Sequence, residues 1–361
     1  MQGSRLLLVC AAAYVAVAPG TRTAEIAAVI KDRVDAKKAA GMAVATIEPD
    51  GTQSMAAYGS PGPGALPLDG DSVFEIGSIT KVFTAILLAE MADRGEVSLD
   101  DPVAKHLPPG VKVPERGGRK ITLLDLTTQV SGLPRMPDNF KPKDMTNPYA
   151  DYTAEQMFEF LGRYELPRGI GERFEYSNLG VGLLGQALTR RAGKSYDALI
   201  KERILAPLKM EHTGVVLTPW MRDHLAKGHN AQLAVTANWD IPAFAGAGAL
   251  RSTLNDMLIF ARANLGVLPP SGQDVQRLQR LMQQTHTARA AAGSDAAAIG
   301  MGWIIRKAGE REVVWHNGGT GGYRTWMGFD KGRKVAAIVL TNSSVSNDDL
   351  GFTLLAGPVG R

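Results

Sequence analysis

The sequence predicts an α+β protein in which a central antiparallel sheet, flanked by helices, carries a mostly helical insertion. Strand-like patterns lie near both ends of the 361-residue chain, around residues 42–59 and 301–342. Between them, residues 101–244 show helical patterns separated by loops rich in proline and glycine, with few strand signals. Strands from the two chain ends would therefore share one sheet, while the middle of the chain forms a separate unit.

The N-terminal part of the sheet domain contributes helices and a hairpin. Residues 24–41 have the periodicity of a helix that ends at Gly41. Residues 42–59 indicate a strand, a Pro-Asp-Gly turn and a second strand. Most of the stretch FEIGSITKVFTAILLAEM, residues 74–91, predicts a buried helix that stops near Gly95.

The C-terminal part supplies the rest of the sheet domain. A helix capped by Ser252 or Thr253 comes first, followed by a meander of three strands within residues 301–342 and a closing helix near residues 347–357. A cleft between two regions of this kind is a common place for a binding site. The predicted boundaries are residues 25–100 and 245–361 for the sheet domain and 101–244 for the inserted helical domain.

The N-terminus is typical of an exported protein. A short positive segment precedes an apolar run over residues 6–18, which is shorter than the ~20 residues that a membrane span needs. We therefore predict a signal peptide over residues 1–24, a secreted or periplasmic mature chain and no stable membrane span. The one cysteine, Cys10, lies in this segment. Lipid attachment at Cys10 is the alternative, and either way the mature chain would have no disulfides.

Ser78 and Lys81 lie three residues apart near the start of the apolar helix, so they share one helix face. The helix is apolar nearly all round, which indicates burial. A buried ammonium must find hydrogen-bond partners or lose its proton, and a neutral lysine can take the proton of a neighbouring hydroxyl. N–H groups at the helix N-terminus can stabilise an oxyanion. The pair thus predicts an activated serine nucleophile; the alternative is a helix cap beside a lysine that reaches water.

The segment GERFEYSNLG supports the nucleophile interpretation. Tyr176 and Asn178 lie in a loop that runs into an apolar helix. A phenol held near a lysine can carry a proton. Asn178 can accept a hydrogen bond from Lys81 and donate its amide to a substrate carbonyl. The alternative is a loop tyrosine followed by an asparagine cap.

The segment WHNGGTGGYRTW provides a second indication. His316 lies on the second of the three predicted strands and is followed by Gly318 and Gly319. Packing does not explain so glycine-rich a strand, whereas the approach of a peptide-like substrate to its edge does. The N–H of Gly319 could then act beside that of Ser78 as an oxyanion donor. A glycine-rich bulge and turn is the alternative.

Three motifs in the order S-x-x-K, Y-x-N and [K/H]-x-G resemble those of the serine β-lactamase and penicillin-binding protein superfamily. The similarity is greatest to class C β-lactamases and their relatives, the DD-peptidases and family VIII carboxylesterases. The flanking segments ITLLDLTTQVSGLP, ILAPLKMEHTG and GAGALRSTLNDM are similar to that family too. The resemblance covers roughly residues 24–342 and implies a β-lactamase/DD-peptidase-like fold, with the site in a groove between sheet domain and all-helical domain.

The resemblance also implies a role for each motif residue. Ser78 would be the acylated nucleophile, and Lys81 and Tyr176 would share the general base and acid work. Asn178 would orient the substrate amide, and His316 would stand where the family often has lysine. The backbone N–H groups of the nucleophile and of the second glycine would form the oxyanion hole. The expected oxyanion and substrate-binding residues are Asn317, Gly318, Gly319, Thr320 and Arg324.

The third motif departs from the family in its charge. A histidine is usually neutral at pH 7, so His316 removes the permanent cation that lysine supplies. Asn317 replaces the usual hydroxyl residue. Because β-lactams and peptidoglycan stem peptides both carry a carboxylate, these changes predict weaker anion binding, unless Arg324 supplies the missing charge.

The leading prediction is an exported serine hydrolase that acts on β-lactam amides through an acyl-enzyme. A DD-carboxypeptidase or a carboxylesterase would use the same residues, and a receptor that penicillin acylates with little turnover is the alternative from another class. The net charge of +4, without a basic block, gives no indication of nucleic-acid binding. No motif predicts a metal or another cofactor. We expect a monomer whose partner is a small molecule: a β-lactam, a D-amino-acid peptide or a short ester.

Overall fold

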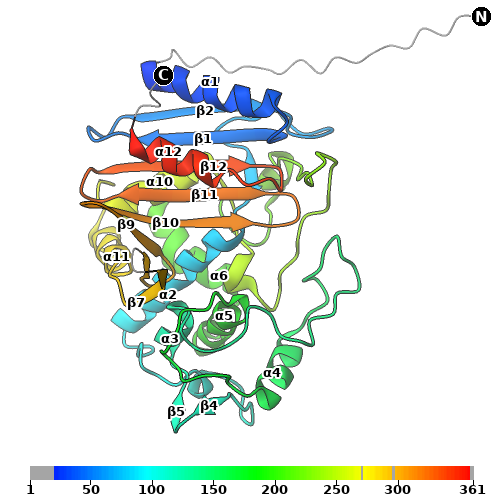
Figure 1. The fold of residues 1–361 in the computed structure, drawn as a ribbon, viewed down its shortest axis with the longest axis vertical. Coiled ribbons are helices and arrows are strands. Elements are labelled where there is room, and N and C mark those ends of the chain that lie inside the picture. Colours follow the sequence, from blue (N-terminus) through cyan, green and yellow to red (C-terminus); the bar gives the residue numbers. More distant parts are fainter. Residues whose placement is uncertain (1–19, 270, 295–296, 358–361) are drawn as a thin grey trace, which may run out of the picture.

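The computed structural model describes residues 20–269, 271–294 and 297–357, and its central feature is an eight-stranded antiparallel sheet (Figure 1). The strand order is β2-β1-β12-β11-β10-β9-β8-β7, so strands from the two ends of the chain lie side by side, as the sequence predicts. The strands are β1 (Gly41–Ile47), β2 (Gln53–Gly59), β7 (Ala290–Ser294), β8 (Ala297–Ile299), β9 (Ile304–Ala308), β10 (Arg311–Gly319), β11 (Arg324–Asp330) and β12 (Val335–Thr341).

Both faces of the middle of the sheet are covered, because every residue of β1 and of β12 is buried. On one face, alternate residues such as Met42 and Val44 pack with α1 (Thr21–Asp35) and α12 (Asp348–Ala356). The intervening residues of the same strands join the main core on the other face. This period of two is the expected pattern of a strand with two apolar neighbours.

The second region of the molecule is helical, with one small exception, and lies at the far end from α1 in Figure 1. The buried helix α2 (Thr80–Asp93) stands between it and the sheet, and every residue from Thr80 to Met91 is buried. A two-stranded hairpin, β4 (Glu115–Arg116) and β5 (Arg119–Lys120), interrupts the helical texture. The remaining α-helices among the described residues, in chain order, are α3 (Leu123–Thr127), α4 (Ala154–Arg163), α5 (Asn178–Ala192), α6 (Tyr196–Ile200), α7 (Ala206–Leu208), α8 (Pro219–Asp223), α9 (Ala245–Gly248), α10 (Leu254–Leu265) and α11 (Gln273–Gln284).

Several local predictions are confirmed. Gly95, with a left-handed φ of 71°, follows α2 as its predicted cap. Thr253 caps α10, because its side chain accepts a hydrogen bond from the N–H of Asp256. The closing helix is α12. Within the described residues, no helix is both long enough and apolar enough to cross a membrane. The predicted signal peptide lies outside the described residues except for residues 20–24, which lead into and begin α1.

The first helix is shorter than its sequence pattern predicts. It ends at Asp35, and Lys37 adopts a left-handed φ of 58°. Gly41 begins β1 instead of capping the helix. A Cβ on Gly41 would lie 2.7 Å from the carbonyl oxygen of Ser60, so this glycine serves the close approach of two chain segments.

The stretch over residues 74–91 is not one helix. Its start belongs to β3 (Val73–Glu75), which pairs with β6 (Arg251–Thr253), and a 3₁₀ turn over Gly77–Ile79 then leads into α2. Gly77 has a φ of 52°, a conformation outside the right-handed helical region. Ser78 therefore lies in a tight turn immediately before the long helix.

The C-terminal meander has four strands, β9 to β12, where three were predicted, and β7 and β8 extend it further. Gly309, with a φ of 64°, forms the turn that separates β9 from β10. The alanine-rich β7 has little intrinsic preference for a strand, so it was missed.

The end of β10 lies unusually close to the turn that carries Ser78. A Cβ on Gly318 would lie 1.9 Å from the carbonyl oxygen of Ile76, and one on Gly77 would lie 2.5 Å from the N atom of Gly319. The hydroxyl of Thr325 also donates to the Ile76 carbonyl at 2.9 Å. The glycines of the third motif thus allow the sheet and the Ser78 turn to meet.

We expect Gly318→Ala to destabilise the protein by about 1–3 kcal/mol, because its methyl group would overlap the Ile76 carbonyl. The measurement is urea unfolding followed by circular dichroism. The matched control is Gly162→Ala in α4, where the nearest atom to a new Cβ is 4.0 Å away. That variant should gain about 0.5–1 kcal/mol from helix propensity. Equal unfolding midpoints for the two variants would contradict the close approach.

Candidate active site

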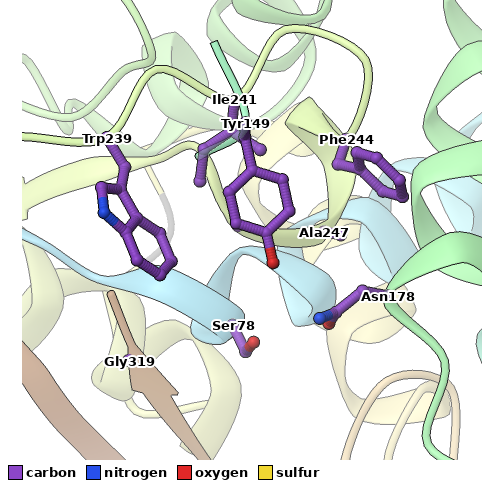
Figure 2. Close-up of a pocket in the computed structure, with 9 residues that line it drawn as sticks. Ser78, Tyr149, Asn178, Trp239, Ile241, Phe244, Ala247 and Gly319 are labelled. Atoms are coloured by element: carbon purple, nitrogen blue, oxygen red, sulfur yellow. The ribbon is translucent and has the colours of Figure 1, made fainter. Parts of the chain in front are cut away.

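The Ser78 turn lies at a pocket between the sheet and the helical region (Figure 2). Figure 2 shows Trp239, Tyr149 and Phe244 along one side of the pocket, and Ser78, Asn178 and Gly319 along the other. The pocket therefore brings together residues of the first, second and third motifs. Its lining residues are Ser78, Tyr149, Asn178, Trp239, Ile241, Phe244, Ala247, Gly248 and Gly319.

Lys81 is buried, with 1% of its surface exposed, and its Nζ atom has three polar neighbours. Nζ lies 3.0 Å from Ser78 Oγ, 2.9 Å from Asn178 Oδ1 and 2.7 Å from the carbonyl oxygen of Ala247. Burial, helped by the positive charge of Arg135, lowers the pKa of Lys81 well below its ordinary value.

The identity of these neighbours indicates how a neutral Lys81 is oriented. The amide oxygen of Asn178 and the Ala247 carbonyl can only accept hydrogen bonds, so they take the two N–H groups of the neutral amine. Ser78 Oγ is the neighbour that can donate a proton, so in a neutral Lys81 the lone pair of Nζ would accept from it. The geometry is that of a base ready to deprotonate a serine.

The second motif is held by the start of α5. Ser177 caps this helix, because its Oγ accepts from the N–H of Gly180 at 2.8 Å and donates to the carbonyl of Pro134 at 2.7 Å. The cap fixes Tyr176 and Asn178 on either side of it. Lys81 Nζ lies 4.9 Å from the centre of the Tyr176 ring. Burial raises the pKa of Tyr176 to about 12, and Ser78 partly opposes this shift.

His316 is buried on β10 and faces the same tyrosine, with ring centres 6.1 Å apart. Its Nδ1 donates to the carbonyl oxygen of Asn317 at 2.6 Å, because a carbonyl cannot donate. Burial first, and then the charge of Lys81, lower the pKa of His316 to about 3. His316 is therefore neutral at pH 7 and its Nε2 atom is a hydrogen-bond acceptor, so the third motif contributes no cation.

The backbone near Ser78 and Gly319 lies where the predicted oxyanion site would be. Both residues line the pocket, and a Cβ on Gly77, just before Ser78, would lie 2.5 Å from the N atom of Gly319. Two N–H groups brought this close can both point to one developing oxyanion. The glycine of each segment is what permits the approach.

Two of the predicted substrate-binding residues, Asn317 and Arg324, have side chains that bind other parts of the protein. Asn317 points to the opposite face of the sheet, where its amide donates to Asp348 Oδ2 at 2.6 Å. Arg324 lies beside Gly319, but its Nη1 donates to the carbonyls of Thr320 at 2.8 Å and of Tyr323 at 3.0 Å. Arg324 therefore closes the turn after β10.

Thr320 belongs to the same turn. Its side chain is buried, and its hydroxyl has no hydrogen-bond partner among the described residues. Its N–H donates to the Tyr323 carbonyl at 3.1 Å. Its backbone therefore shapes the turn beside the predicted oxyanion site.

The aromatic wall of the pocket was not predicted from the sequence. Tyr149, Trp239 and Phe244 come from two loops of the helical region. Trp239 is fixed by its N–H, which donates to Glu75 Oε1 at 2.9 Å, and by its indole N–H, which donates to the Thr146 carbonyl at 3.1 Å. The sequence does show aromatic residues in proline-containing loops, but no local pattern shows that these loops meet at the pocket.

A serine hydroxyl beside a buried lysine whose pKa is lowered, a nearby phenol and this α+β scaffold are the features expected of a serine hydrolase of the β-lactamase/DD-peptidase fold. The chain belongs to the Beta-lactamase family, whose model it matches over residues 26–356. The resemblance stated from the three motifs and the predicted fold class are thereby confirmed.

The relatives of this chain include D-alanine carboxypeptidases as well as β-lactamases. The chain is 32% identical over 316 residues to the D-alanyl-D-alanine-carboxypeptidase/endopeptidase AmpH of Escherichia coli K12, covering 85% of this chain and 80% of AmpH. A β-lactamase/D-alanine carboxypeptidase from Yersinia pestis, solved with citrate, is 27% identical with a TM-score of 0.78 over 92% of this chain and 97% of that one. A class C β-lactamase from Rhodobacter sphaeroides, at 21% identity, shares the fold with a TM-score of 0.76 over 90% and 95% of the two chains.

We expect the rate of Ser78 acylation to rise with pH as Lys81 loses its proton, because Lys81 acts as a base only when neutral. Since burial lowers the pKa of Lys81, the rise should be complete well below its ordinary value of 10.5. Tyr176, with a pKa of about 12, keeps its phenol proton throughout. Stopped-flow acylation by a chromogenic cephalosporin between about pH 5 and pH 11 measures this.

The control for this profile is Lys81→Arg, whose guanidinium stays charged over the whole range. That variant should acylate very slowly and show no rise with pH in this range. A wild-type rate that rises with a midpoint at or above pH 10.5 would show that the pKa of Lys81 is not lowered.

Proposed function

We propose that this protein is an exported serine hydrolase that acts on β-lactam amides through an acyl-enzyme at Ser78. The observation that carries the proposal is the set of contacts of Lys81 Nζ, in which Ser78 Oγ is the one neighbour that can donate a proton to a neutral amine. Export is proposed from the signal-peptide pattern of residues 1–24. The partner we propose is a small molecule bound by a monomer.

Acylation can be written with the groups of the pocket. Neutral Lys81 takes the proton of Ser78, whose Oγ attacks the carbonyl carbon of the substrate, and the oxyanion binds the N–H groups of Ser78 and Gly319. When the tetrahedral intermediate collapses, the C–N bond breaks. The leaving nitrogen receives the proton of Tyr176, which is replenished from the Lys81 ammonium. Asn178 donates its amide to the substrate and keeps Lys81 in place.

Hydrolysis of the acyl-enzyme completes the cycle. A water molecule attacks the ester carbonyl with the Lys81 and Tyr176 pair as the base, the Ser78 ester bond breaks, and a carboxylic acid leaves. In a β-lactam the expelled nitrogen stays tethered to the acyl group and remains in the pocket. The rate of this second half decides between a hydrolase and a receptor that stays acylated.

A second candidate function is a DD-carboxypeptidase. It is supported by the two relatives that carry this name, the E. coli enzyme at 32% identity and the Y. pestis enzyme at 27%. The acylation chemistry would be the same, but the leaving group is a free D-amino acid that departs from the cleft. The neutral His316 gives no advantage to either substrate, since both carry a carboxylate.

The test is intact-mass spectrometry of the purified mature protein over a time course with a penicillin. Hydrolysed penicillin without a lasting adduct supports the β-lactamase. A stable adduct with little hydrolysis supports a DD-carboxypeptidase or an acylated receptor, and release of D-alanine from a D-alanyl-D-alanine peptide then separates these two.

Ser78→Ala should form no adduct and hydrolyse no penicillin, while its thermal unfolding stays close to wild type because only one hydroxyl is lost. The matched control is Ser271→Ala, at an exposed position away from the pocket. Adduct formation or turnover by Ser78→Ala at the wild-type rate would end the claim that Ser78 is the nucleophile.

A further inference from the structure

We propose that Arg135, on the helical side of the cleft, is the residue that recognises the carboxylate of the substrate. The inference rests on the proposed function, since it assigns a substrate feature to the same pocket. The third motif is where the sequence places the carboxylate site, with Arg324 as the candidate cation. The inference moves that site to the helical region.

The position of Arg135 is fixed by the second motif. Its carbonyl oxygen accepts from the N–H groups of Asn178 at 3.1 Å and of Leu179 at 3.2 Å, at the start of α5. Its guanidinium carbon lies 5.0 Å from the centre of the Tyr176 ring. Lys81 Nζ lies 4.9 Å from the centre of the same ring, so both basic groups are neighbours of Tyr176.

The guanidinium of Arg135 is also available. Its side chain is exposed, and among the residues that the structure describes it has no hydrogen bond and no carboxylate within ion-pair distance. Nearby arginines of the helical region differ in this respect. Arg168 forms an ion pair with Glu175, and Arg163 forms one with Asp138.

The other basic groups of the site are less available than Arg135. Burial lowers the pKa of Lys81 and that of His316, which favours their neutral forms. Arg324 keeps its charge, but it is only partly exposed and its Nη1 atom donates to two carbonyls of its own turn. Of the two arginines, Arg135 is the one whose side chain is exposed and whose guanidinium has no hydrogen-bond partner among the described residues.

The charge of Arg135 also acts on the residues of the pocket. It lowers the pKa of Lys81, and it opposes the increase that burial causes in the pKa of Tyr149 and of Tyr176. A guanidinium presents donors in a fork that matches a carboxylate, so it can provide orientation as well as attraction. We therefore expect the substrate to bind with its carboxylate toward the helical wall.

The experiment compares kcat/KM for two matched pairs of substrates, one member with a carboxylate and one without. The first pair is benzylpenicillin and its methyl ester; the second is the p-nitrophenyl ester of succinate and that of acetate. We expect Arg135→Gln to lower the ratio of charged to neutral member by about tenfold, the range of a lost hydrogen bond to a charged group. Arg135→Lys should retain part of the ratio.

The matched control is Arg190→Gln. Arg190 is also exposed and lies over an aromatic ring, with its guanidinium carbon 5.2 Å from the centre of Phe158, and it belongs to the last turn of α5, whose first residue, Asn178, lines the pocket. The Arg190→Gln variant loses the same charge and the same type of contact. It should nevertheless keep the wild-type ratio of kcat/KM between charged and neutral substrates. Thermal unfolding of all three variants checks that they fold.

A second readout is the pH dependence of acylation. Because a neighbouring positive charge disfavours the Lys81 ammonium, Arg135→Gln should raise the pKa of Lys81 and move the rise in rate to higher pH. A residue that only packs on Tyr176 would leave both the pH profile and the substrate ratio unchanged.

The outcomes separate this inference from the proposed function. If penicillin is not processed but the nitrophenyl esters are, β-lactam hydrolysis fails as the function, and the ester pair still decides the role of Arg135. An unchanged ratio in Arg135→Gln, or a wild-type protein that shows no preference for the charged member of either pair, overturns the assignment.

Discussion

The burial of Lys81 is the constraint on which the rest of the site depends. An ammonium without water is costly, and the cost falls if the group loses its proton and keeps its hydrogen bonds. The three neighbours of Nζ meet that requirement, and each comes from a different part of the chain: the Ser78 turn, the start of α5 and α9. The lowered pKa of Lys81, on which its proposed role as a base depends, thus results from the packing of α2 between the sheet and the helical region.

Bringing these parts together requires segments without side chains. The Ser78 turn can lie against β10 only because Gly77 and Gly318 have no Cβ. The same contact places the N–H of Gly319 beside the nucleophile. Packing and chemistry therefore impose the same residue type at these positions, and a glycine-rich strand end that looks weak as a strand is a condition for the predicted oxyanion site.

How far the sequence predicts the site depends on how local each feature is. The three-residue spacing of Ser78 and Lys81 is enough to place them side by side, even though the chain there forms a 3₁₀ turn and not the first turn of a helix. Strand alternation already implied that Asn317 points away from His316, so that error was avoidable. The hydrogen bonds of Arg324 could not be predicted, because its partners are carbonyls of a turn whose geometry the sequence does not reveal. The aromatic wall depends on the meeting of two loops, which no local pattern reports.

The distribution of positive charge gives the departures of the third motif a common explanation. A permanent cation at position 316 would be buried beside Lys81, and each would destabilise the other's charge. A neutral His316 removes that conflict but leaves a substrate carboxylate without a partner on β10. An exposed guanidinium beside the Tyr176 ring keeps a positive charge near Lys81 at a lower desolvation cost, since it remains in contact with water. The replacement of lysine by histidine is therefore compatible with an anionic substrate, provided that the anion is bound from the helical side.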